Sequence, residues 1–201
     1  MTPASGARLL AAEDPRLGAG IDLADARAIV ASVAVTSADA DGFRARVLDF
    51  IDQHPDALHR TCVAGHLTGS ALVVEADTER ILMLFHRKLQ RWLQPGGHAD
   101  GDANLAAVAL REASEETGLS GLRIDPHPID IDIHRVSPPG EPPHDHLDVR
   151  YLVVAPTGSI PIGNHESERL RWVDIDQLAE LGVDPGTVRM ATSGLDRFRQ
   201  T

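Results

Sequence analysis

Three glutamates at the end of one amphipathic segment constrain this chain more than any other feature. The spacing of apolar residues predicts a helix over residues 103–117. At about 100° per residue, Glu112, Glu115 and Glu116 fall within one sector of that helix. The same sector is apolar over the first turns, at positions 105 and 108. The three carboxylates therefore extend an apolar stripe, and we expect them to lie against the body of the protein.

This placement of the glutamates is unfavourable for the helix by itself. Glu112 repels Glu115 and Glu116 at spacings of three and four residues, each costing a few tenths of a kcal/mol. The helix dipole disfavours each anion in the last turns by about 0.3–1 kcal/mol. A divalent cation removes both penalties, and oxygen ligands suit Mg²⁺ or Mn²⁺. The alternative is a solvated acidic face partnered by Arg111 and Arg123.

The rest of the chain mixes helices and strands, which predicts an α/β or α+β fold. Asp102 is the expected N-cap of the acidic helix and Gly118 its left-handed end. Residues 1 to about 20 have the composition of a loosely docked start. Periodicity predicts further helices at residues 23–34, 41–53, 176–181 and 185–199. Strands are expected at residues 70–75 and 80–86, joined as a hairpin, and at 129–136, 147–155 and 170–173.

Composition limits the partners of the chain. A formal net charge of −11 on 201 residues disfavours non-specific binding to nucleic acid or to an anionic membrane. A phosphate-bearing substrate stays compatible with that charge if a metal ion lies between acid and phosphate. The single cysteine, Cys62, excludes an internal disulfide. No apolar run is long enough to span a bilayer and no leader opens the chain, so we expect a cytoplasmic location.

The segment around the glutamates resembles the Nudix box. Residues at seven fixed positions match that signature: Gly97, Arg111, Glu112, Glu115, Glu116, Gly118 and Leu119. The approach to the box, residues 91–98, is also similar to the family pattern. One position departs, because Ala103 stands where the family has an isolated glutamate. Asp102 lies one residue earlier, and a one-residue shift of the loop would let it take that place with a shorter reach. The resemblance spans residues 68–181.

The resemblance implies a fold and an activity. The fold is an α-β-α sandwich with a mixed sheet, made by a hydrolase domain at residues 65–201 that includes a C-terminal helix. Residues 1–64 are expected to form a helical extension packed on that domain. The implied activity is metal-dependent hydrolysis of a diphosphate linkage in a nucleoside diphosphate joined to another group, or in a similar small diphosphate, by attack of water on phosphorus. A homodimer is left open.

The resemblance also assigns roles to residues. Glu112 and Glu116 are the principal expected Mg²⁺ ligands, with Mn²⁺ as the other candidate, and Glu115 is a ligand or the general base. Arg111 is expected to hold the box carboxylates in place. The backbone of Gly96 and Gly97 is expected to approach metal or phosphate closely.

A loop near the later strands offers two further candidates for the base, Glu166 and Glu168. Their alternative role is that of surface acids paired with Arg169 or Arg171. Arg150 is a candidate phosphate contact on the strand over residues 147–155, or else it forms a cross-strand salt bridge with Asp148 or a neighbour.

Two other functions are weighed against hydrolysis. A catalytically silent nucleotide sensor has no need of a complete glutamate set. An isoprenoid-diphosphate isomerase is expected to place a reactive cysteine at the site, whereas Cys62 precedes the predicted sheet. His98, His144 and His146 are read as a transition-metal site, as phosphate contacts or as a solvated loop, and a structural zinc site is not expected because no cysteine accompanies them. His66 is expected at the surface or in a cap.

Overall fold

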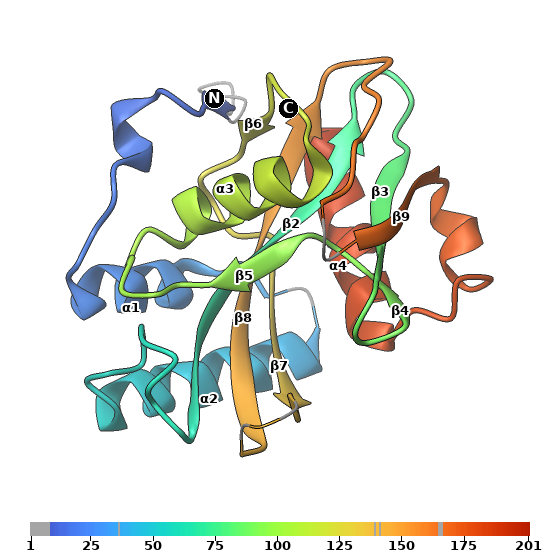
Figure 1. Ribbon diagram of the computed structural model, residues 1–201. Coiled ribbons are helices and arrows are strands. Elements are labelled where there is room, and N and C mark those ends of the chain that lie inside the picture. The colour runs from blue at the N-terminus through green and yellow to red at the C-terminus, as the bar shows by residue number, and fades with distance from the viewer. Residues whose placement is uncertain (1–8, 36, 139, 141, 165–166) are drawn as a thin grey trace.

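The computed structural model describes residues 9–35, 37–138, 140, 142–164 and 167–201 (Figure 1). Its four α-helices are α1 (Leu23–Ser32), α2 (Ala38–Gln53), α3 (Leu105–Thr117) and α4 (Pro185–Phe198), and two 3₁₀ helices are η1 (Pro15–Leu17) and η2 (Ile175–Leu178). The strands are β1 (Leu10–Ala11), β2 (Gly65–Glu75), β3 (Ile81–His86), β4 (Arg91–Leu93), β5 (Gly96–His98), β6 (Arg123–Ile124), β7 (Asp130–Val136), β8 (His144–Ala155) and β9 (Ser167–Val173). None of the described helices is long and apolar enough to cross a membrane.

The described strands form one mixed sheet in the order β1-β6-β8-β2-β3-β4. Its centre is the parallel pair β2 and β8, in register from Gly65 opposite Asp145 to Glu75 opposite Ala155. The other pairs are antiparallel, with β5 added to β2, β7 to β8 and β9 to β3. The predicted hairpin of β2 and β3 is confirmed by the pairing of Val74 with Ile81.

Helices cover both faces of the sheet, which confirms the predicted sandwich (Figure 1). Successive residues of a strand point to opposite faces, so β2 contributes to two cores. Its residues 67, 71 and 73 pack with α3, and its residues 72 and 74 pack with α4. The whole of β2 is buried, as expected of a central parallel strand.

Gly69 brings α3 close to the sheet. A Cβ atom at this position would lie 2.7 Å from the carbonyl oxygen of Leu105 and 3.2 Å from the nitrogen of Ala109. The backbone of α3 therefore rests directly on β2. This close packing fixes the height of the glutamates above the sheet.

The N-terminal segment packs on the same core as α3. Val30 of α1 and Val47 and Ile51 of α2 belong to the buried cluster on that face. The expectation of a loosely docked start is wrong for residues 10 and 11, because Leu10 is buried and pairs with Ile124 of β6. A two-residue edge strand carries too little sequence pattern to be recognised.

Candidate active site

The C-terminal half of α3 faces β5, and this junction holds the acidic cluster. Glu116 is only 7% exposed, and one of its carboxylate oxygens accepts a hydrogen bond of 2.9 Å from the backbone N–H of Gly96. Glu112 lies one turn earlier and is partly buried, whereas Glu115 is exposed. The predicted sector therefore does extend the sheet-facing stripe of the helix, and Glu115 forms its outer edge.

Gly97 leaves room for the carboxylate of Glu112. A Cβ atom at position 97 would lie 2.5 and 2.8 Å from the two carboxylate oxygens, which is too close for any side chain. Gly97 pairs with Gly69 across β2 and β5. Gly69 makes room for the backbone of α3, and Gly97 makes room for the carboxylate of Glu112. A side chain at position 97 would therefore displace the carboxylate of Glu112 from this place.

Burial makes the negative charge of Glu112 unfavourable. Burial raises the pKa of its carboxyl group above the usual range; Arg111 opposes this rise, and the charge of Glu115 adds to it. The nearest guanidinium nitrogen of Arg111 is 3.4 Å from Glu112. A cation beside Glu112 would favour its ionised form. Oxygen donors and partial burial together fit a hard divalent cation.

The ligand atoms are not drawn together into a three-carboxylate set. The described residues contain two groups of three side chains whose ligand atoms lie within 4.8 Å of one another inside each group. Neither group contains Glu112, Glu115 or Glu116. Carboxylate side chains can reorient about a bound ion, since each reaches the site through flexible bonds. The metal role of the glutamates accordingly stays a prediction.

Asp102 connects this site to the N-terminal segment. One carboxylate oxygen accepts hydrogen bonds from the backbone N–H groups of Gly20, at 3.0 Å, and Asn104, at 2.9 Å. The other oxygen is 4.0 Å from Arg111. The prediction of Asp102 as the N-cap is wrong, because α3 begins at Leu105 and Asn104 caps it. Asp102 lies two residues before the cap and holds the loop that leads into α3 through these hydrogen bonds.

The later loop passes the C-terminal end of α3. The side-chain amide of Asn164 donates to the carbonyl of Glu115 at 3.3 Å, and the N–H of Ile162 donates to the carbonyl of Thr117 at 2.7 Å. Glu166 lies outside the described residues. Glu168 belongs to β9, but its side chain is not described. Their roles stay predictions.

Arg150 lies in a buried ion-pair network. Its guanidinium binds Asp148 at 2.9 Å, Asp130 at 3.1 Å and Asp132 at 3.0 Å, and its side chain is 2% exposed. Arg189 of α4 binds Asp130 and Asp132 as well, at 3.0 and 2.8 Å. This arrangement favours the cross-strand ion pair over a direct phosphate contact, because the guanidinium is already enclosed by aspartates.

A histidine cluster lies on the face of the sheet opposite α3. His98 and His146 are brought together as the sequence suggested, and their Nε2 atoms are 3.3 Å apart. The expectation that His66 lies at the surface or in a cap is wrong, since it is buried between them and His144. Sequence missed it because only the pairing of β2 with β8 places His66 beside His146.

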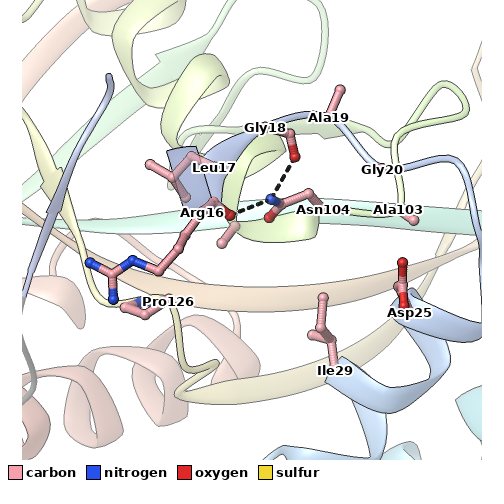
Figure 2. A pocket seen from close by; sticks show the side chains of 11 residues that line it. Arg16, Leu17, Gly18, Ala19, Gly20, Asp25, Ile29, Ala103, Asn104 and Pro126 are labelled. Carbon is pink, nitrogen blue, oxygen red and sulfur yellow. Dashed lines mark hydrogen bonds between the residues drawn. The ribbon is translucent and has the colours of Figure 1, made fainter. Parts of the chain in front are cut away.

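A cavity of about 400 Å³ lies at the other end of α3, lined by residues 16–20, α1, the start of α3 and Pro126 (Figure 2). The side-chain amide of Asn104 donates to the carbonyls of Arg16 and Gly18 at its wall. None of the predicted site residues lines this cavity. It is a junction between the N-terminal segment and α3.

Comparison with known proteins gives related sequences and folds. The sequence model of the NUDIX domain matches residues 66–192. A protein of Streptomyces rubellomurinus named CMP-5'-(N-acetyl-N-hydroxy-3-aminopropyl)phosphonate hydrolase is 32% identical over 133 residues, covering 61% of this chain and 58% of its own length. A Lactococcus lactis protein named "Probable DHNTP pyrophosphohydrolase" is 33% identical over 91 residues, covering 43% of this chain and 52% of its own. The chain thus spans little more than half the length of these curated relatives.

A solved structure shares the fold over most of its own length. The crystal structure of a NUDIX-family hydrolase from Clostridium perfringens has a TM-score of 0.55 and 25% identity, covering 66% of this chain and 97% of that one.

Proposed function

The chain belongs to the NUDIX domain family, and from this membership we propose that it is a divalent-metal-dependent hydrolase of a diphosphate linkage. The proposed substrate is a nucleoside diphosphate joined to another group, or a similar small diphosphate. One relative is named as a hydrolase of a CMP-linked phosphonate and another as a pyrophosphohydrolase, which supports a substrate with a nucleotide or pterin part and a phosphoryl linkage.

The observation that carries the proposal is the meeting of α3 and β5. Glu112 lies over Gly97, and Glu116 accepts the N–H of Gly96. These two carboxylates are the proposed ligands of Mg²⁺, with Mn²⁺ as the other candidate ion. A bound divalent cation would neutralise phosphate charge and lower the pKa of a coordinated water.

The residues around the carboxylates have separate proposed roles. Arg111 holds Glu112 by its 3.4 Å contact and extends toward Asp102. The backbone of Gly96 and Gly97 is proposed to approach the metal or a phosphate, because neither residue has a side chain of its own. Glu115, which is exposed, serves as a further ligand or as the base that orients water.

Glu166 and Glu168 are the alternative bases. Their support is the position of the preceding segment, since Asn164 binds the last turns of α3. The base among these glutamates takes a proton from the attacking water as the new O–P bond forms, while the P–O bond of the diphosphate bridge breaks and the leaving phosphate keeps that electron pair. We also propose residues 1–64 as an extension and 65–201 as the hydrolase domain, with the bonds of Asp102 and Asn104 to residues 16–20 joining the two.

The experiment is a substrate panel assayed with wild-type protein and E116Q. Nucleotide sugars, dinucleotides, ADP-ribose and nucleoside triphosphates are incubated with Mg²⁺, and release of a monophosphate or of pyrophosphate is measured. Glutamine can still accept the N–H of Gly96, so E116Q is expected to stay folded while Mg²⁺-dependent turnover is lost. The matched control is E180Q, at an exposed glutamate beyond η2.

Each outcome of this assay distinguishes between the proposed hydrolase and its alternatives. Turnover by wild type and E180Q but not by E116Q supports the proposal. Full activity of E116Q removes Glu116 from the metal site. Nucleotide binding by the wild type without any turnover favours a sensor instead.

A further inference from the structure

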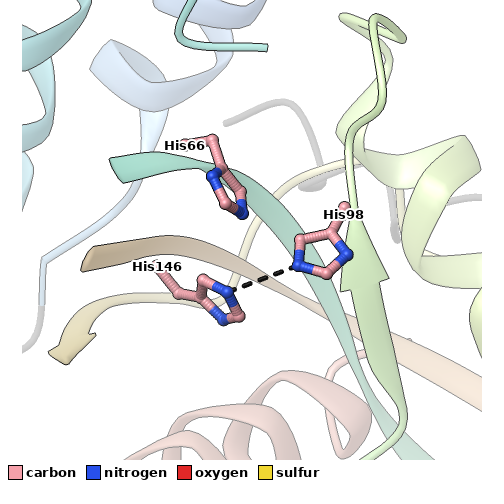
Figure 3. A group of neighbouring side chains, drawn as sticks. All are labelled: His66, His98 and His146. Carbon is pink, nitrogen blue, oxygen red and sulfur yellow. Dashed lines mark hydrogen bonds between the residues drawn. The ribbon is translucent and has the colours of Figure 1, made fainter. Parts of the chain in front are cut away.

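Three histidines converge on the face of the sheet away from the acidic cluster. They come from three strands: His66 from β2, His98 from β5 and His146 from β8 (Figure 3). One ring nitrogen from each lies within 4.8 Å of the others. We propose that these three side chains form a second metal site, specific for a transition-metal dication of the zinc class.

Strand geometry separates this site from the glutamates. A side chain at Gly97 would point at Glu112, so the next residue of β5, His98, points to the opposite face. Thr68 pairs with His98 and points to the same face of the sheet. Its hydroxyl donates to Asp148, which belongs to the ion-pair network of Arg150 on the α4 side. The two sites thus lie on opposite sides of one short strand.

The distance between one ring nitrogen of His98 and one of His146 fits two ligands of the same metal ion. Zinc binds histidine nitrogen at about 2.0–2.1 Å with tetrahedral angles, which places two ligand nitrogens about 3.3–3.4 Å apart. The Nε2 atoms of His98 and His146 are 3.3 Å apart and hydrogen-bonded to each other (Figure 3), which a bound ion would replace. Their ring planes are nearly perpendicular, at 89°, so both nitrogens can face a common point without the rings stacking.

His66 provides the independent evidence for a ligand. Its side chain is 2% exposed, and neither of its ring nitrogens has a hydrogen-bond partner among the described residues. An unsatisfied buried polar atom costs about 1–3 kcal/mol. The ring centre of His66 is 4.9 Å from that of His98 and 5.1 Å from that of His146. A bound ion would take the lone pair of one unpartnered nitrogen.

The ligand type selects the ion. Three imidazoles with no carboxylate in the set suit zinc-class ions and disfavour Mg²⁺, which prefers oxygen. Three protein ligands leave the fourth tetrahedral position for water. Because the ligands come from β2, β5 and β8, the ion would fasten the short strand β5 to the central pair of strands.

The test is zinc titration of the 201-residue chain after treatment with EDTA, with a competing chromophoric chelator and millimolar Mg²⁺ present to occupy oxygen sites. One zinc ion per chain is expected. H66N, H98N and H146N should each weaken zinc binding at least tenfold. H127N is the matched control, since that side chain is 71% exposed and lies outside the cluster. E112Q should bind zinc as the wild type does, which separates this site from the proposed hydrolytic one.

The contrary results are equally specific. Wild-type zinc affinity in the three variants would overturn the proposal. Loss of zinc in C62S would also overturn it, by assigning the ion to the other group of donors, His54, Asp56 and Cys62. If H66N fails to fold by circular dichroism, H98N and H146N decide the matter, since both positions are only partly buried. X-ray absorption should show nitrogen at about 2.0–2.1 Å and no sulfur neighbour.

Discussion

Replacing Gly97 by alanine should separate the function of the acidic cluster from the stability of the fold. The new Cβ atom would lie 2.5 and 2.8 Å from the carboxylate oxygens of Glu112, so that carboxylate must move. It is the far end of a flexible, partly buried side chain and can turn away at little cost. The backbone of β5 need not change, because Gly97 is not among the residues with a positive φ angle.

The matched comparison is G69A on the neighbouring strand. There the Cβ atom would meet the backbone of α3, at 2.7 Å from the carbonyl oxygen of Leu105, and a helix backbone cannot rotate away. Overpacking of this kind costs about 1–3 kcal/mol or more. For a chain of this size each kcal/mol lowers the melting temperature by about 2–4 °C. G69A should therefore melt about 2–12 °C below the wild type.

The assay is Mg²⁺-dependent turnover of the best substrate from the panel, together with thermal unfolding. G97A should melt within about 2 °C of the wild type, which corresponds to less than 1 kcal/mol. Its turnover should fall at least tenfold, equivalent to about 1.4 kcal/mol of lost transition-state stabilisation. Wild-type turnover in G97A, at the same Mg²⁺ dependence, would refute a role for the position of Glu112.

Two further predictions concern the opposite face of the sheet. R150M should lower the free energy of unfolding by about 3–5 kcal/mol in urea titration, because it leaves the buried carboxylate of Asp148 without its guanidinium and leaves Asp130 with Arg189 alone. Unchanged stability with a raised KM would instead assign Arg150 to substrate. Burial and the neighbouring charges of His98 and His144 lower the pKa of His66 to about 4. The folded state therefore resists protonation, so the metal-free protein should lose stability as the pH falls from about 6.5 to 4, at up to about 1.4 kcal/mol per pH unit for this group. H66Q should lack that part of the slope, and an identical slope in both proteins would contradict it.

Local patterns predicted the parts of the fold that depend on nearby residues. The acidic helix follows from an apolar spacing of three to four residues, and its end follows from Gly118. The hairpin between β2 and β3 follows from the two-residue period of its strands. The N-cap was misplaced by two residues, because Asp102 and Asn104 both carry a side chain suited to capping. The choice between them depends on Gly20, which engages the carboxylate of Asp102 from 82 positions away.

The site was predictable on the helix and not on the sheet. The position of Glu112 and Glu116 against β5 follows from the helical period together with two glycines. The surroundings of Arg150 and His66 depend on the parallel pairing of β2 with β8, two strands about 80 residues apart. No pattern within either strand specifies that partner or its register.

The contacts of Gly20 have a consequence for how much of the chain the NUDIX domain needs in order to fold. The NUDIX match begins at residue 66, yet Asp102 and Ala103, at the entry to α3, are both hydrogen-bonded to Gly20. A chain cut at the start of the match would lose these bonds and would expose the apolar surface that α1 and α2 now cover. The segment that precedes the NUDIX match in sequence thus forms part of the same core in space, and its removal would force the start of α3 to repack.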